Sequence, residues 1–120
     1  MIVGMAAHLP GAGSVDQFWA NLCAGTGSIT RLTKQELLEA GETAERLRDP
    51  NYVPASAVLN GFDMFDAAFF GLSPKDAAIM DPQHRQFLEI AWEAMENAGH
   101  PPETIAGPIG VFAGCGMGSY

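Results

Sequence analysis

The sequence predicts an α/β protein, in which buried strands pack against helices that each have one apolar face. Two observations lead to this class. Continuous apolar runs at residues 2–5 and 109–113 have the composition of strands that are buried on both faces. Between them lie segments that combine capping signals with apolar residues at helical spacing, a pattern typical of amphipathic helices.

At the amino end, the apolar run is followed by a turn and then by a helix that we expect to start after Ser14. Ser14 and Gln17 have capping-box spacing, and Gly25 is expected to end the helix. Its apolar face would consist of Val15, Phe18, Trp19, Leu22 and Cys23. The order strand, turn, helix is that of the first half of a βαβ unit.

The middle of the chain is expected to hold shorter elements. Thr33 and Glu36 form a second capping box, and Gly41 stops the helix that follows it. Residues 42–48 are charged and indicate a short helical turn at the surface. Residues 55–59 are compatible with a short strand, and the dipeptide at 60–61 is a hairpin signal.

The longest helix is expected from about Pro82 to Ala98 and would form the spine of the core. Asp81 can cap it, and Gly99, followed by two prolines, ends it. A shorter helix should precede it, started by Ser73 and the residues after it. Residues 62–71 hold four phenylalanines and are too aromatic for a free loop, so we expect this segment to pack against the core.

Composition restricts the class of partner. The 6 Lys and Arg residues against 14 Asp and Glu give a net charge of −8, which argues against nucleic acid, because affinity for it comes mostly from neutralised phosphates. The same charge argues against anionic membrane surfaces. A hydrophobic content of 48% predicts a folded chain, with residues 1–120 in one domain. The absence of a signal peptide and of a long apolar run predicts a cytoplasmic protein without a disulfide framework.

Three segments in this order and spacing resemble the amino-terminal part of β-ketoacyl synthases, above all the ketosynthase domains of modular type I polyketide synthases. They are IVGMAAHLPGAGSVDQFW, FDAAFFGLSPKDAAIMDPQHRQFLEIAWEAMENAG and GPIGVFAG. The resemblance covers nearly all of the chain and is weakest at about residues 33–48. It implies a thiolase-like layered α-β-α-β-α fold built from two similar halves, of which this chain would form the first half only.

The resemblance also implies a decarboxylative Claisen condensation. In that family a cysteine takes an acyl group from the phosphopantetheine of an acyl carrier protein, and two histidines help to decarboxylate a malonyl-type extender, in an enzyme that is a homodimer. The family's T-A-C-S-S-type cysteine turn and its histidines lie beyond Tyr120. We therefore expect a fragment cut at its carboxyl end, without catalytic residues, which supplies scaffold and is inactive alone.

The chain's own reactive side chains support that expectation. Cys115 follows the second apolar run among glycines, but no base is assigned to it, and Cys23 is expected to lie in the core. His84 lies in the first turn of the spine helix, and His8 and His100 lie in turns. No pair has metal-ligand spacing, and the glycine-rich pieces lack phosphate-binding features. We predict no metal and no cofactor-binding residue in this chain.

Arg85 allows two interpretations. It can pair with Glu89 one helical turn away, or it can be buried and paired within the family motif. Two alternative functions also stay open. The chain can be a non-catalytic binding or dimerisation module that pairs with a separately encoded remainder, or a small independent α/β enzyme.

Overall fold

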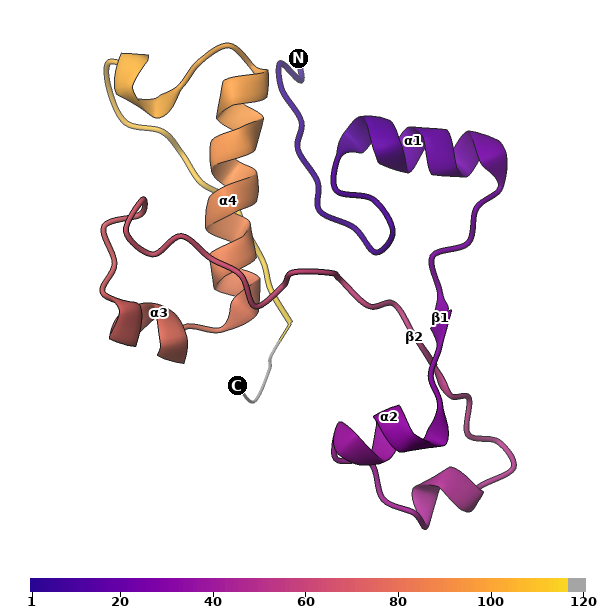
Figure 1. The fold of residues 1–120 in the computed structure, drawn as a ribbon. Coiled ribbons are helices and arrows are strands. Elements are labelled where there is room, and N and C mark those ends of the chain that lie inside the picture. The colour runs from indigo at the N-terminus through magenta and orange to yellow at the C-terminus, as the bar shows by residue number, and fades with distance from the viewer. Residues whose placement is uncertain (117–120) are drawn as a thin grey trace.

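A computed structural model describes residues 1–116 of the chain. The elements are α1 (Val15–Ala24), β1 (Thr30–Arg31), α2 (Lys34–Glu39), η1 (Arg46–Arg48), β2 (Ala55–Ser56), α3 (Pro74–Ile79), α4 (Pro82–Asn97) and η2 (Pro102–Thr104). Figure 1 shows α2 and η1 apart from the other helices, joined to them by β1 and β2. The radius of gyration is 17.9 Å, whereas a compact domain of this length has about 13.6 Å. The arrangement is therefore open.

The two expected helices of the amino-terminal half are confirmed. Ser14 accepts a hydrogen bond from the Gln17 backbone at 3.2 Å, but the Gln17 side chain donates to Asn21 rather than completing the box. At α2 the capping box is complete, because Glu36 also accepts from the backbone N–H of Thr33 at 2.7 Å. The short surface turn expected within residues 42–48 is η1.

The two expected helices of the carboxyl-terminal half are also confirmed. Ser73 caps α3 by accepting from the backbone of Asp76 at 3.1 Å. Asp81 caps α4 by accepting from the backbone of Gln83 at 2.8 Å. The helix ends at Asn97, one residue before the predicted end, and Gly99 then turns the chain with a φ of 73°, a conformation that glycine adopts without steric cost.

The strand predicted at residues 55–59 is present as the two residues of β2, which pairs antiparallel with β1. The sequence patterns did not predict β1. The hairpin predicted at residues 60–61 is wrong. Gly61 does open a turn, in which its carbonyl accepts from Met64 at 2.9 Å, but β2 already pairs with a strand that precedes it, so this turn joins no two strands within residues 1–116.

The two terminal strands are a second correction. Residues 2–5 and 109–113 carry no strand assignment and have no β partner within residues 1–116. Their apolar side chains are exposed, Ile2 at 79%, Val111 at 67% and Phe112 at 100%. A strand requires a neighbour at about 4.8 Å to pair its backbone groups. The apolar pattern therefore identified segments suited to a sheet, and no neighbouring strand from the described chain lies beside them.

Burial in the described residues is sparse for the same reason. Only Ala12, Leu37 and Ala77 are buried apolar residues, and Arg85 is the buried charged one. Along α4 the predicted apolar stripe is half-buried. The spine helix is thus covered on part of its surface and, within this part of the chain, lacks the sheet that the sequence pattern implied.

The aromatic segment packs onto α4, as predicted. Phe65 and Phe70 stack with ring centroids 5.1 Å apart, and Phe69 meets Phe70 edge to face at 5.0 Å. Phe69 also meets Trp92 of α4 edge to face at 4.7 Å, a favoured geometry for aromatic pairs. This contact fixes residues 62–71 against one side of the helix.

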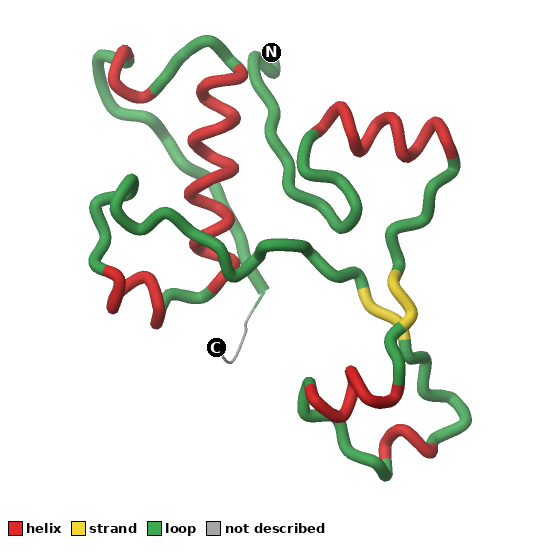
Figure 2. The backbone as a smooth tube through the Cα atoms, viewed as in Figure 1, coloured by secondary structure: helices red, strands yellow, loops and turns green. Residues whose placement is uncertain are grey.

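The amino-terminal segment lies against another side of α4 (Figure 2). The backbone N–H of Met5 donates to the Asn97 side chain at 3.0 Å. At Gly4 an added Cβ would meet the carbonyl oxygen of Ala94 and lie 2.7 Å from the Cβ of Ala98. The close approach of the two backbones therefore requires glycine.

Gly4→Ala should lower the urea midpoint of unfolding, measured by far-UV circular dichroism. The new methyl group has no space between the segment and α4, and an overpacked contact of this kind costs about 1–3 kcal/mol. Gly13→Ala is the control, because within residues 1–116 no atom beyond Gly13 and its two chain neighbours lies within 4 Å of a Cβ there. Equal midpoints for the two variants would contradict the observed packing.

Candidate functional site

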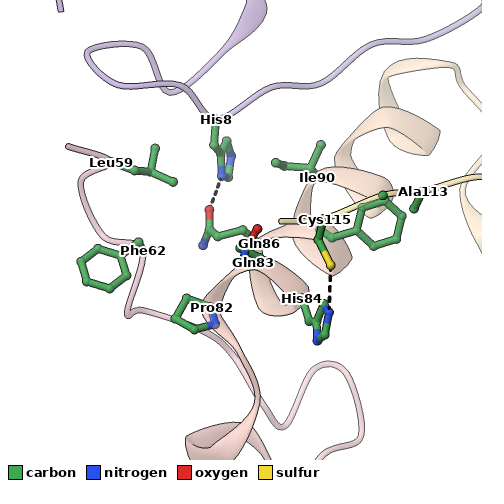
Figure 3. Close-up of a pocket in the computed structure, with 12 residues that line it drawn as sticks. His8, Leu59, Phe62, Pro82, Gln83, His84, Gln86, Ile90, Ala113 and Cys115 are labelled. Carbon is green, nitrogen blue, oxygen red and sulfur yellow. Dashed lines mark hydrogen bonds between the residues drawn. The ribbon is translucent and has the colours of Figure 1, made fainter. Parts of the chain in front are cut away.

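A cavity of about 670 Å³ lies beside the amino-terminal half of α4. Figure 3 shows that its walls come from three parts of the chain: α4, the segment before α3, and residues 113–115, with His8 at one end. Its apolar lining is Leu59, Phe62, Pro82, Phe87, Ile90, Ala113 and Gly114, and its polar lining is His8, Gln83, His84, Gln86 and Cys115. A mostly apolar cavity with a few convergent polar groups is typical of a small-molecule site.

The first turn of α4 positions the carboxyl-terminal segment in this cavity. Gln83 accepts from the backbone N–H of Gly116 at 3.2 Å and lies 3.4 Å from its carbonyl, to which it donates. This pair of contacts places Cys115 Sγ 3.6 Å from Nε2 of His84. The sequence patterns assigned no base to Cys115, because His84 is 31 residues away along the chain. The structure supplies an imidazole within hydrogen-bond distance of the thiol.

The pair brings a thiol and an imidazole within reach of proton transfer. A catalytic pair of this kind usually has a third group that orients the base. Within residues 1–116, Cys115 is the one hydrogen-bond partner of the His84 ring. That the chain has no catalytic residue therefore stays a prediction.

His8 forms the second polar cluster of the site. Its Nδ1 lies 3.0 Å from Oε1 of Gln86, and its Nε2 lies 3.0 Å from Oε1 of Glu93. The Gln86 amide nitrogen donates to Glu89 at 3.0 Å, which leaves its oxygen for His8. Both ring nitrogens thus face oxygen atoms, and only the imidazolium form can donate to both.

This arrangement raises the pKa of His8 above its ordinary value of 6.5. The largest cause is the hydrogen bond to Gln86, which outweighs the desolvation that lowers the pKa, and the charges of Glu93 and Glu89 add to the rise. The role of His8 as a link between the amino-terminal segment and α4 was not predicted. Its partners are 78 and 85 residues away, so no local pattern indicated them.

The other residues singled out from sequence have simpler positions. Cys23 was expected in the core, and this is wrong, because it is exposed on α1. The helix face that carries it has no cover within the described residues. His100 is exposed, as a turn residue should be. Arg85 is buried, which confirms that part of the second interpretation, and its Nη1 lies 3.5 Å from the backbone carbonyl of Asp63.

Residues 1–116 contain neither a metal-binding cluster nor a helix suited to a bilayer. No group of three or more His, Cys, Asp or Glu side chains is placed to hold a metal ion in this part of the chain. Among the helices described, none has the length and apolar character that spanning a bilayer requires.

The chain is similar to known proteins over nearly its whole length. The family described as "Beta-ketoacyl synthase, N-terminal domain" matches residues 1–120. A phenolphthiocerol/phthiocerol polyketide synthase of Mycobacterium tuberculosis is 47% identical over 119 residues, which cover 99% of this chain and 8% of that protein. Polyketide synthase PksM of Bacillus subtilis is 41% identical over 124 residues, which cover 94% of this chain and 3% of that protein.

Two solved structures resemble the chain in three dimensions. Ketosynthase twelve from the bacillaene polyketide synthase of Bacillus amyloliquefaciens has a TM-score of 0.70 and 43% identity, over 79% of this chain and 17% of that chain. The module 6 ketosynthase of the bacillaene synthase of Bacillus subtilis 168 has a TM-score of 0.72 and 33% identity, over 86% and 17%. These likenesses confirm the predicted α/β, thiolase-like class. The chain spans only a small part of the length of each of these relatives.

The cluster around His8 predicts that the chain is more stable in mildly acidic solution. Because the pKa of His8 is raised in the folded state from 6.5, its contribution is complete below 6.5 and is lost as the pH rises through the folded value. The urea midpoint should therefore be higher at about pH 6 than at about pH 8.5.

Two variants test the cause of this pH dependence. His8→Gln should remove it, and Glu93→Gln should lower the pKa of His8 followed by NMR titration of its ring protons. A His8 pKa at or below 6.5 in the unsubstituted chain would show that the cluster does not form.

Proposed function

The chain belongs to the β-ketoacyl synthase family, and from this premise we propose that it is part of a polyketide-type β-ketoacyl synthase, an acyltransferase. The proposed reaction joins a carrier-bound acyl group to a malonyl-type extender by decarboxylative Claisen condensation. The likeness to polyketide synthases and ketosynthases along nearly the whole chain supports this reaction. The proposed partner is an acyl carrier protein that bears phosphopantetheine, and the proposed assembly is a cytoplasmic homodimer.

Within this enzyme we propose that residues 1–120 supply scaffold, not catalytic groups. The cysteine turn and the two histidines of the family are not among these residues, and the pair of Cys115 and His84 has no third group from residues 1–116 to orient its base. Oxyanion donors and an oriented base are what lower the barrier of an acyl transfer.

One observation carries the scaffold proposal. Gly4 lies against α4 and Ala113 lines the cavity beside it, while the apolar side chains of Val111 and Phe112 are exposed. Exposed apolar chain with unpaired backbone groups is suited to pairing with further strands. This is the arrangement expected if the sheet of a layered α/β domain continues beyond these residues.

The same exposed surface favours a second candidate function, a non-catalytic binding or dimerisation module that pairs with a separately encoded remainder. The amphipathic helix α1 points to it as well, because Trp19 is 67% exposed and Leu22 is 55% exposed. A cooperative thermal transition of a monomer in solution would favour this candidate, since a scaffold fragment with uncovered apolar faces should associate or bind an apolar dye.

The scaffold proposal predicts that the purified chain is inactive in condensation. Incubated with an acyl thioester and a malonyl thioester labelled in its free carboxyl group, it should release no labelled carbon dioxide above the rate without protein. The physical reason is that the proposed scaffold lacks groups that stabilise the carbanion and the oxyanion. Turnover with formation of a β-keto product would contradict the proposal.

A chimera gives the positive test. In the Bacillus amyloliquefaciens ketosynthase that is 43% identical, the matching amino-terminal residues are replaced by this chain. Condensation should persist within about tenfold of the parent rate, a change of about 1.4 kcal/mol in activation free energy. The control is the same chimera with the host's nucleophilic cysteine changed to alanine. A folded chimera without activity would count against the scaffold role.

A further inference from the structure

Cys115 and His84 both line the apolar cavity. Cys115 lines the cavity together with Phe87 and Ile90 of α4, and its side chain is exposed to that space. His84 lies at the third position of the 16-residue helix α4. A thiol, a proton acceptor and an apolar recess are therefore adjacent, although they come from segments that are far apart in sequence.

We propose that this cluster is a thiol modification site, at which Cys115 adds to small α,β-unsaturated carbonyl compounds that carry an apolar substituent. The proposal concerns a conjugate addition by this chain's own thiol and does not depend on the Claisen reaction or on an acyl carrier protein. Its basis is the 3.6 Å contact between Cys115 Sγ and His84 Nε2 at the wall of the cavity.

The geometry favours the nucleophile. The imidazole of His84 can accept the thiol proton directly, and the thiolate is the form of cysteine that attacks an electrophile. The two contacts of Gln83 with Gly116 hold the cysteine at the amino end of α4.

The cavity determines the class of electrophile. Its volume of about 670 Å³ accommodates a small organic molecule. The side chains around Cys115 are mainly apolar, with Leu59 and Phe62 facing α4 across the space. Within residues 1–116 no Lys or Arg lines it, and both ring nitrogens of His8, at one end of the cavity, are already bound to Gln86 and Glu93. An uncharged, apolar group beside the reactive double bond fits best.

The proposed step balances without an added reagent. The Cys115 thiol gives its proton to His84, and the thiolate forms a carbon–sulfur bond at the β-carbon of the acceptor. The electron pair of the carbon–carbon double bond moves to the α-carbon, which takes the proton back from the imidazolium directly or through water. No group leaves and nothing is oxidised. An acyl transfer would additionally need donors for an oxyanion, and conjugate addition does not.

The chain contains its own internal control, because Cys23 is the second cysteine. It is exposed on α1, and no hydrogen bond to its thiol occurs within residues 1–116. Both thiols are therefore accessible to a reagent, and in the described chain only Cys115 has a proton acceptor and an apolar cavity beside it. A difference in their rates reports on the site and not on accessibility alone.

The experiment measures the rate at which each cysteine of the purified chain reacts with N-methylmaleimide and N-benzylmaleimide, by quantitative peptide mass spectrometry. Cys115 should react about tenfold faster than Cys23, in the manner of thiols beside a histidine. The preference should be larger with the benzyl reagent. In concentrated urea the two cysteines should react equally, because the preference depends on the folded cavity.

Substitutions separate the contributions. His84→Gln should slow Cys115 to about the rate of Cys23 and leave Cys23 unchanged, whereas His100→Gln, a matched exchange outside the cavity, should change neither. Phe87→Ala should remove the preference for the benzyl reagent and keep the reaction with the methyl reagent. Equal native rates for the two cysteines, or an unchanged Cys115 rate in His84→Gln, would overturn the proposal.

Discussion

The packing of other segments onto α4 is the interaction on which the described structure depends. Three segments of the chain meet this helix through four contacts at different levels. The amino-terminal segment touches its last turns at Gly4, and His8 links to it through Gln86 and Glu93. The aromatic segment contacts Trp92, and the carboxyl-terminal segment is held at Gln83. Every side of the candidate site is therefore placed by a contact with one helix.

This arrangement holds together with little apolar burial. The three buried apolar residues within residues 1–116 cannot supply the stabilisation that a closed core gives a domain of this length. Capping hydrogen bonds, edge-to-face aromatic pairs and the polar links to α4 act in its place, and each of these contributes little by itself. The exposed apolar chain at residues 2–5 and 109–113 agrees with a family whose solved members are about five times longer, since 79% and 86% of this chain cover 17% of the two compared above.

The cavity illustrates how a site arises from such packing. Cys115 and His84 meet because Gln83, next to His84 on α4, binds the backbone of Gly116, next to Cys115. The apolar lining comes from α4 and from the segment before α3, which the aromatic cluster positions. The family's scaffold role and the local thiol chemistry are therefore compatible: the first depends on the bare outer faces of the terminal segments, and the second on a recess beside the amino end of α4.

Local signals determined the helices of this protein. Ser14, Thr33, Ser73 and Asp81 cap the helices that the sequence patterns placed there, because a cap and an amphipathic repeat act over a few residues of contiguous chain. Tertiary structure alone decided the pairing of β1 with β2, the exposure of the two terminal apolar runs, the links of His8 and the proximity of Cys115 to His84. These depend on which distant segment becomes a neighbour, and a strand or a polar side chain carries no local signal that identifies its partner.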